Sequence, residues 1–309
     1  MTRDVVVVGS INMDLVARAP RLPIPGETLS GSSFATSPGG KGANQAVAAS
    51  RLGAGTAMIG CLGQDAFGAV LRPLLEQDGV DTGAVRAVAG STGVALVVVD
   101  EAGRNGIVVV PGANAELSPA DVDRNGSLIS GARVVALQLE TPLPTVLYAA
   151  ERARGEGKTV VLNPAPAQPL PSRLLACADY LVPNEIEAAM LTGQEVGELE
   201  SAARAAEALR AMGARNVIIT LGERGVVWAT PQGTRHVPAP RVKAVDTTAA
   251  GDTFIGGLCA ALVAGKDLAS AVGFAQAAAA LSVTRVGAQP SIPYEREVET
   301  CCLPGESAL

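Results

Sequence analysis

Short runs of branched aliphatic residues alternate with helical segments along most of this chain, and the alternation restricts its fold more than any other feature. The run Val5–Val8 ends at Gly9 and contains no polar residue, which is typical of a strand buried on both faces. Further strand candidates are residues 57–59, 134–137, 160–162, 180–182 and 217–220, and helical candidates are residues 43–52, 66–77, 144–156, 185–191, 198–212 and 253–284. This order predicts βαβ units, and hence an α/β fold: a three-layer α/β/α, Rossmann-like domain with a mainly parallel sheet.

Two segments interrupt the alternation. Residues 11–38 contain several prolines, glycines and serines and have no helical period, whereas residues 93–111 predict a β-hairpin with a polar, glycine-containing turn. We expect these two segments to form a small β-sheet lid, and residues 1–10, 39–92 and 112–309 to form the α/β core. Such a lid closes over a ligand, forms a dimerisation surface, or does both.

Composition restricts the partners and the compartment. The 309 residues are 48% hydrophobic and 17% charged, which favours a well-packed globular protein. The net charge of −6 is spread without a basic tract, so we expect no nucleic-acid partner and no membrane partner. The five cysteines are odd in number and mostly isolated, and no signal peptide or membrane span is visible, so a cytoplasmic location is expected. The single histidine, His236, is expected in a surface loop, which leaves carboxylates as the proton carriers.

The most specific chemical signal surrounds Asp252. This residue follows Ala249, Ala250 and Gly251 at the expected start of a helix. Small side chains there leave backbone N–H groups accessible to an anion, and the helix dipole adds partial positive charge. A carboxylate beside such an anion hole suits a reaction in which a hydroxyl loses its proton and attacks a phosphate. Taken alone, the motif is equally compatible with a plain helix cap.

A glycine-rich segment around Lys41 precedes the first helical candidate. It resembles a Walker A loop, but Gly42 stands where that loop needs Ser or Thr, so a nucleotide P-loop is rejected. Gly39, Gly40 and Gly42 would instead allow the backbone to approach a polyhydroxy ligand. Lys41 and Asn44 would supply hydrogen-bond donors, although a flexible loop without function remains an alternative.

Other polar residues follow predicted strands, at the edge where open α/β sheets bind ligands. Asn12 and Asp14 occupy alternate positions of an extended segment, so both can face one ligand and bind its hydroxyls. Glu140 follows another strand. Asn184 is by default a helix cap, and Glu187 is a candidate to hold a magnesium-bound water.

Two loops complete the set: residues 220–225 form a turn suited to a nucleotide, and residues 284–291 offer carbonyl oxygens to a cation. In this order and combination, the motifs resemble the PfkB family of carbohydrate kinases over essentially the whole chain. The segments Gly-Gly-Lys-Gly-Ala-Asn-Gln-Ala and Asp-Thr-Thr-Ala-Ala-Gly-Asp-Thr-Phe carry most of the resemblance.

The resemblance implies transfer of the ATP γ-phosphate to the 5-hydroxyl of D-ribose, with Asp252 as the base and the amides of Ala249, Ala250 and Gly251 as the anion hole. The positions that match the family's sugar site are Asn12, Asp14, Gly39, Gly40, Lys41, Gly42, Asn44, Glu140 and Asp252. Those that match its nucleotide site are Asn184, Thr220, Leu221, Gly222, Glu223, Arg224, Gly225, Gly251 and Gln276. Those that match its cation sites are Asp246, Thr248, Ser282, Arg285, Gly287 and Ser291 for K⁺, several through backbone carbonyls, and Glu187 for Mg²⁺ through water. The family also implies a homodimer formed through the lid.

Two departures from the family pattern and three alternatives accompany this prediction. Ile255 replaces a common Asn, and Gln276 stands where Asn or His is usual; the first affects packing and the second affects nucleotide contacts.

A kinase for 2-deoxyribose or a ketose is not excluded by residue type. A nucleoside kinase would need aromatic stacking, for which the lid segments offer only Phe34. A non-catalytic sugar-binding protein would be expected to lose Asp252 or the glycine-rich loop.

Overall fold

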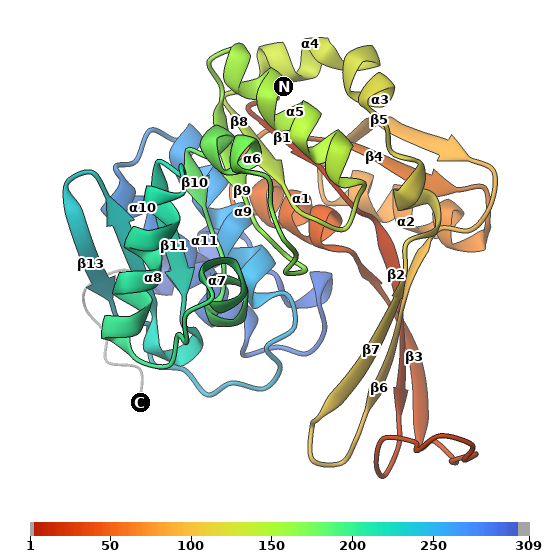
Figure 1. The fold of residues 1–309 in the computed structure, drawn as a ribbon. Helices are drawn as coiled ribbons and strands as arrows, with labels where there is room; N and C mark the ends of the chain where they lie inside the picture. The colour runs from red at the N-terminus through yellow and green to blue at the C-terminus, as the bar shows by residue number, and fades with distance from the viewer. Residues whose placement is uncertain (1–2, 302–309) are drawn as a thin grey trace.

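The structure, a computed structural model, describes residues 3–301. Within them a nine-stranded sheet forms the centre of the larger body (Figure 1). In sheet order its strands are β13 (Gly233–Val237), β12 (Val226–Thr230), β11 (Asn216–Thr220), β10 (Tyr180–Leu181), β9 (Thr159–Leu162), β8 (Val134–Leu137), β1 (Val5–Val8), β4 (Thr56–Gly63) and β5 (Asp81–Val88). All neighbouring pairs from β11 to β5 are parallel, whereas β12 and β13 are antiparallel additions at one edge.

The sheet confirms the predicted mainly parallel α/β architecture and adds strands that the sequence pattern did not indicate. These are β5, β12 and β13. The expectation for His236 was wrong in detail: the residue is exposed as predicted, but it lies on β13 rather than in a loop. Its ring Nε2 is 2.7 Å from the carbonyl oxygen of Arg224, a contact that ties the edge strand to the turn after β11.

Helices cover both faces of the sheet. The hydrophobic cluster on one face takes its helical residues from α3 (Pro119–Arg124), α4 (Gly126–Gly131), α5 (Leu143–Gly155), α6 (Ser172–Cys177), α7 (Glu185–Thr192) and α8 (Leu199–Ala211). The cluster on the other face takes them from α1 (Lys41–Arg51), α2 (Ala66–Gln77), α9 (Ala250–Val263), α10 (Leu268–Ser282) and α11 (Glu295–Cys301). The predicted helix 253–284 is therefore two helices, which separate at Gly265, a residue with a φ of 78°.

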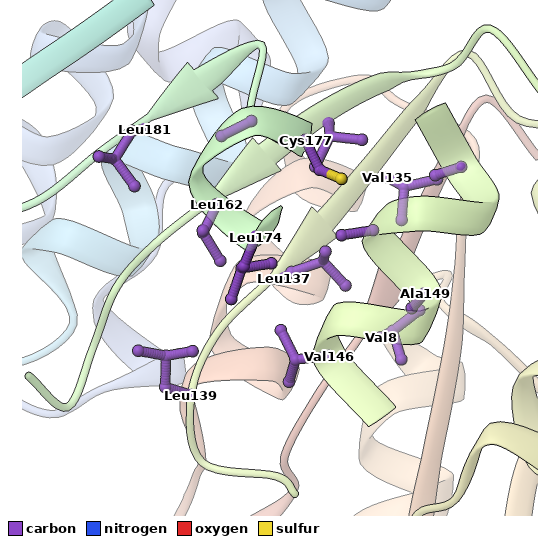
Figure 2. Packing of buried hydrophobic residues seen from close by; sticks show 14 of the residues in the cluster. Val8, Val135, Leu137, Leu139, Val146, Ala149, Leu162, Leu174, Cys177 and Leu181 are labelled. Atoms are coloured by element: carbon purple, nitrogen blue, oxygen red, sulfur yellow. The ribbon is translucent and has the colours of Figure 1, made fainter. Parts of the chain in front are cut away.

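Strand β1 shows how the sequence pattern produces the two clusters. All four valines are 0% exposed, and they alternate, with Val6 and Val8 in the first cluster and Val5 and Val7 in the second. Figure 2 shows the first cluster, where Val8 and Leu137 from the sheet lie near Val146 from α5. A strand that is buried on both faces in this way must be apolar at every position, which explains the continuous valine run.

A second, four-stranded sheet projects from the larger body (Figure 1). Its order is β3 (Ser33–Gly39), β2 (Asn12–Arg18), β6 (Gly93–Val99) and β7 (Asn105–Val110). This sheet, called the lid below, comes from the two segments that interrupt the alternation, and it includes the predicted hairpin β6–β7. No helix within residues 3–301 is long and apolar enough to cross a membrane.

Candidate active site

A cleft of about 1320 Å³ lies between the lid and the carboxyl ends of the central strands. Its walls include eight of the residues that the sequence assigned to sugar binding or catalysis: Asn12, Asp14, Gly40, Lys41, Asn44, Glu140, Ala249 and Asp252. These residues come from four separate places in the chain, so the fold, not sequence proximity, assembles them. The lid supplies Asn12 and Asp14 from one face of β2, and it also supplies an apolar wall from β6 and β7.

The glycine-rich segment enters α1 through a conformation that needs glycine. Gly40 has a φ of 88°, and a Cβ there would lie 2.7 Å from the backbone nitrogen of Asn12. The amide of Lys41 then donates to Glu140 Oε2 over 3.1 Å, and the hydroxyl of Ser10 donates to the same oxygen over 2.6 Å. Glu140, three residues after β8, is thereby held by one donor from the segment after β1 and one from the start of α1.

Asp252 is held by the side chains of α1. Asn44 Nδ2 donates to one carboxylate oxygen over 2.9 Å, and Gln45 Nε2 donates to the other over 3.0 Å. Gln138 Nε2 donates in turn to Gln45 Oε1 over 2.6 Å, which directs the NH₂ group of Gln45 towards the carboxylate. Because both oxygens have a donor and Asp252 is 7% exposed, the carboxylate has one orientation, with its accessible edge on the cleft.

The pKa values in the cleft reflect three carboxylates around one ammonium group. Burial raises the pKa of Asp252, and Lys41, Asn44 and Gln45 act against that shift. Burial, with Glu140 and Asp252 nearby, raises the pKa of Asp14 to about 7. Burial lowers the pKa of Lys41, but the carboxylates of Asp252 and Glu140 outweigh it and the net shift is upward. Lys41 therefore stays an ammonium beside these carboxylates.

The start of α9 supplies free backbone donors beside Asp252. Ala249 has a φ of 59° and a ψ of 12°, a left-handed conformation that costs a non-glycine residue about 1 to 2 kcal/mol. The amide of Ala250 donates to the carbonyl of Thr247 over 3.3 Å, whereas the amides of Gly251 and Asp252 have no acceptor among residues 3–301. These two unpaired N–H groups at a helix N-terminus suit a phosphate oxygen.

The predicted nucleotide residues form a second group that does not line this cleft. Asn184 and Glu187 make a capping box at the start of α7, and Asn184 forms a bridge with Thr220 at the end of β11. The turn from Thr220 to Gly225 closes with a bond from Leu221 N to Gly225 O of 2.8 Å. Burial raises the pKa of Glu187, the backbone amide of Asn184 and the ammonium of Lys41 act against this increase, and the carboxylate of Asp252 adds to it.

Gln276 shows an unusual feature. Its Nε2 is 3.3 Å from the carbonyls of both Val237 and Pro238, while its Oε1 is buried and has no partner. An acceptor left unpaired in a buried site suits a ligand donor. Ile255, the other departure from the family pattern, lies on α9, is 2% exposed and belongs to the hydrophobic cluster on that face of the sheet; it does not line the cleft.

The candidate cation loops are tied together by Asp246. One of its oxygens accepts from the amide and hydroxyl of Thr248, over 2.9 and 2.6 Å, and the other accepts from Gly287 N over 2.9 Å. Arg285 directs its side chain away to Glu297, which leaves only its backbone as a ligand candidate. Within residues 3–301 no three His, Cys, Asp or Glu side chains gather at a metal-binding distance, so carbonyl oxygens would have to contribute. Ser282 and Ser291 are both 0% exposed, and their hydroxyls donate to backbone carbonyls.

Sequence reasoning missed the buried polar residues that orient the predicted ones. Ser10, Gln45, Asn114, Gln138 and Gln289 are all 3% exposed or less. Gln45 and Gln289 lie in motifs next to predicted residues, and a buried amide directly after an apolar strand, such as Gln138, is itself a signal for a polar network. The partners of the four amide side chains among them include residues 93 to 245 positions away in the chain, so only the fold reveals what they hold.

Together, the fold and the site define the class of protein. A model described as pfkB family carbohydrate kinase matches residues 2–295, and the chain belongs to this family. It is a sugar kinase by class.

Among the proteins that the chain resembles are ribokinases and a deoxyribokinase. The chain is 45% identical to the ribokinase of Haemophilus influenzae, with 96% of this chain and 97% of the relative aligned. It is 41% identical to the deoxyribokinase of Salmonella typhi, over 94% of this chain and 95% of the relative. A solved structure of Arabidopsis thaliana ribokinase complexed with ribose and ATP superposes with a TM-score of 0.90 at 35% identity, covering 97% and 98% of the two chains.

Proposed function

We propose that this protein transfers the γ-phosphate of ATP to the 5-hydroxyl of D-ribose, giving D-ribose 5-phosphate and ADP. The observation that carries the proposal is the position of Asp252, oriented by Asn44 and Gln45 beside two free helix amides, in the cleft that also holds Asp14 and Glu140. Similarity to ribokinases, one of them with bound ribose and ATP, selects the sugar and the nucleotide.

In the proposed reaction Asp252 takes the proton of the sugar hydroxyl as that oxygen attacks the γ-phosphorus. The new O–P bond forms while the bond to the bridging β–γ oxygen breaks, and ADP leaves with the electron pair. The free amides of Gly251 and Asp252 and the ammonium of Lys41 stabilise the charge on the phosphoryl oxygens. Burial raises the pKa of Asp252, which makes it a stronger base than an exposed carboxylate, and the ammonium of Lys41 acts against that increase.

Sugar hydroxyls would bind to the side chains that flank the base. Asp14 and Glu140 are acceptors, Lys41 and Asn44 are donors, and Asn12 faces the same cleft from the lid. We propose that Gly39, Gly40 and Gly42 allow the backbone to reach the sugar. The nucleotide would lie along Asn184, the Thr220–Gly225 turn and Gln276.

The cation proposals rest on donor chemistry. Oxygen ligands suit both Mg²⁺ and K⁺, and the loops joined by Asp246 supply a carboxylate with neighbouring carbonyls. Glu187 offers a buried carboxylate to a magnesium-bound water. When bound, Mg²⁺ would neutralise the phosphate oxygens and K⁺ would order the loop before α9. Asp246, Thr248, Ser282, Arg285, Gly287 and Ser291 are the proposed K⁺ residues.

We also propose that residues 11–38 and 93–111 act as a lid on a core made of 1–10, 39–92 and 112–309. The lid face that points away from the cleft carries exposed apolar side chains: Leu96 is 46% exposed, Val108 61% and Phe34 67%. Such a face is suited to a second copy of the chain, so we propose a homodimer through the lid. A cytoplasmic location remains part of the proposal, because ATP and the free buried cysteines Cys61, Cys177 and Cys259 fit a reducing compartment.

A coupled ADP-release assay with D-ribose, 2-deoxyribose, fructose, other hexoses and nucleosides tests the function. The proposal predicts the highest kcat/KM for D-ribose and dependence on Mg²⁺ and K⁺. Turnover of 2-deoxyribose above that of ribose would favour the second candidate, which similarity to a deoxyribokinase supports. Nucleoside turnover is not expected, because Phe34 pairs with Ala17 and lies on the lid face opposite the cleft. No turnover of any compound would refute the kinase proposal.

A further inference from the structure

Asn114 lies at the root of the lid and does not belong to any motif of the proposed reaction. It sits in the 3₁₀ helix η1 (Gly112–Glu116), directly after β7, and is 1% exposed. Its Oδ1 accepts from the backbone N–H of Ile11 over 2.9 Å, and its Nδ2 is 3.2 Å from the Ile11 carbonyl. The same Nδ2 donates to Asn12 Oδ1 over 2.7 Å. All its hydrogen-bonding groups are thus used at the start of β2.

These bonds determine which end of the Asn12 amide faces the cleft. A backbone N–H can only donate and a carbonyl can only accept, so Ile11 admits one orientation of the Asn114 amide. The NH₂ group of Asn114 then requires the oxygen of Asn12, because two NH₂ groups cannot bond to each other. The Nδ2 of Asn12 remains; it has no acceptor among residues 3–301, and its side chain lines the cleft. The N–H and C=O groups of Ile11 therefore determine the orientation of the Asn114 amide, which determines that of the Asn12 amide and leaves the Asn12 NH₂ group as a donor in the cleft.

The lid connections converge on this pair of amides. A Cβ at Gly93, the first residue of β6, would overlap both Asn114 Nδ2 and Asn12 Oδ1. Register pairs Gly93 with Asn12, so β2 and β6 enter the lid side by side at this point. Asn114 itself follows the last lid strand. The Asn12 and Asn114 side chains thus lie where the starts of β2 and β6 and the segment after β7 meet. Their close packing there leaves the two amides little freedom to rotate.

We infer that Asn114 is a positioning residue, which presents the Asn12 NH₂ group as a donor to a hydroxyl oxygen of the sugar; this rests on the sugar-kinase function proposed above. Without Asn114, the Asn12 amide is free to turn and to present its carbonyl oxygen instead. A sugar hydroxyl that donates to Asp14 or Glu140 still has lone pairs that can accept a hydrogen bond. The Asn12 NH₂ group supplies the donor for them.

A double-mutant cycle measured by D-ribose binding in calorimetry tests the inference. Asn114→Asp keeps the acceptor for Ile11 N–H and removes the donor to Asn12. We expect Asn12→Ala and Asn114→Asp each to raise the Kd for D-ribose about tenfold, the effect of one hydrogen bond. The double variant should bind no more than about twofold more weakly than Asn12→Ala. An additive loss of about a hundredfold would overturn the inference, because Asn114 would then act independently of Asn12.

Two controls separate positioning from a loss of folding or of function. The thermal midpoint and the KM for ATP should stay near those of the parent, and Asn114→Ala replaces Asn114→Asp if the latter does not fold. Asn12→Asp leaves Asn114 untouched and exchanges the donor for an acceptor, so its Kd should rise at least as much as that of Asn12→Ala. Parental affinity in Asn12→Asp would overturn the inference. Binding of D-ribose by the parent without turnover would refute the proposed kinase function alone, whereas no binding would refute both.

Discussion

Replacing Asp14 by Asn should stabilise the protein at alkaline pH while it weakens sugar binding. The Asp14 carboxyl is buried near the carboxylates of Glu140 and Asp252, and the ammonium of Lys41 opposes their effect on its pKa. Burial and these neighbours raise its pKa from 3.8 to about 7. The folded state therefore holds the Asp14 proton more tightly than the unfolded state does between these two pH values.

The sign and size of the effect follow from proton linkage. Below pH 3.8 both states are protonated and Asp14 costs no stability; above pH 7 both are ionised and the folded state carries the whole cost. A shift of about three units at 1.36 kcal/mol per unit corresponds to about 4 kcal/mol, of which about 2.5 kcal/mol develops between pH 5 and pH 8. Asn has the same shape and does not ionise, so the variant escapes this cost.

Urea denaturation of the parent and of Asp14→Asn, at pH 5 and pH 8 and constant ionic strength, measures the difference in the free energy of unfolding between the two proteins. The variant's advantage in unfolding free energy should grow by about 2.5 kcal/mol from pH 5 to pH 8, and its Kd for D-ribose should rise. Asn12→Ala is the matched control, because it alters the neighbouring cleft residue without removing a charge; its effect should be the same at both pH values. An Asp14→Asn advantage that does not change with pH would refute the reasoning.

Three further outcomes are expected. Gln45→Met removes one of the two donors to Asp252, so kcat should fall about tenfold. The pKa of Asp252 should rise further, and the acidic limb of the pH profile of kcat should therefore move to higher pH. An acidic limb that does not move would contradict this role of Gln45. Gly40→Ala places a Cβ at a positive φ and against the backbone nitrogen of Asn12, so it should lower the free energy of unfolding, measured by urea denaturation, by about 1 to 3 kcal/mol. An unchanged free energy of unfolding would contradict the predicted strain. Val108→Asp adds charge to the exposed lid face, so sedimentation equilibrium should show a monomer; an unchanged dimer would exclude that face.

The central sheet was predictable because burial on two faces requires apolar residues at every position. Val5–Val8 and Val134–Leu137 therefore stand out, and both strands have the predicted bounds. Strand β13 was not predictable in the same way, because it lies at the exposed edge and its residues Gly233–Val237 include Arg235 and His236. Edge strands are only partly buried, so their sequences lack the apolar signal.

The site was predictable only where its residues form local motifs. Asp252 and the glycines near Lys41 need particular neighbours in sequence, because a helix start and a tight turn are local structures. Gln138 and Asn114 have no such constraint. They act on Gln45 and Asn12 across 93 and 102 residues of chain, and hydrogen bonds of that range exist only once the fold has formed.

The most direct test of the account is the turnover of Asp252→Asn with D-ribose and ATP. An amide cannot accept the hydroxyl proton, so kcat should fall by a factor of about 10² to 10⁴, while the Kd for D-ribose should stay within about threefold, since Asn12, Asp14 and Glu140 remain. A kcat close to that of the parent would contradict the assignment of Asp252 as the base.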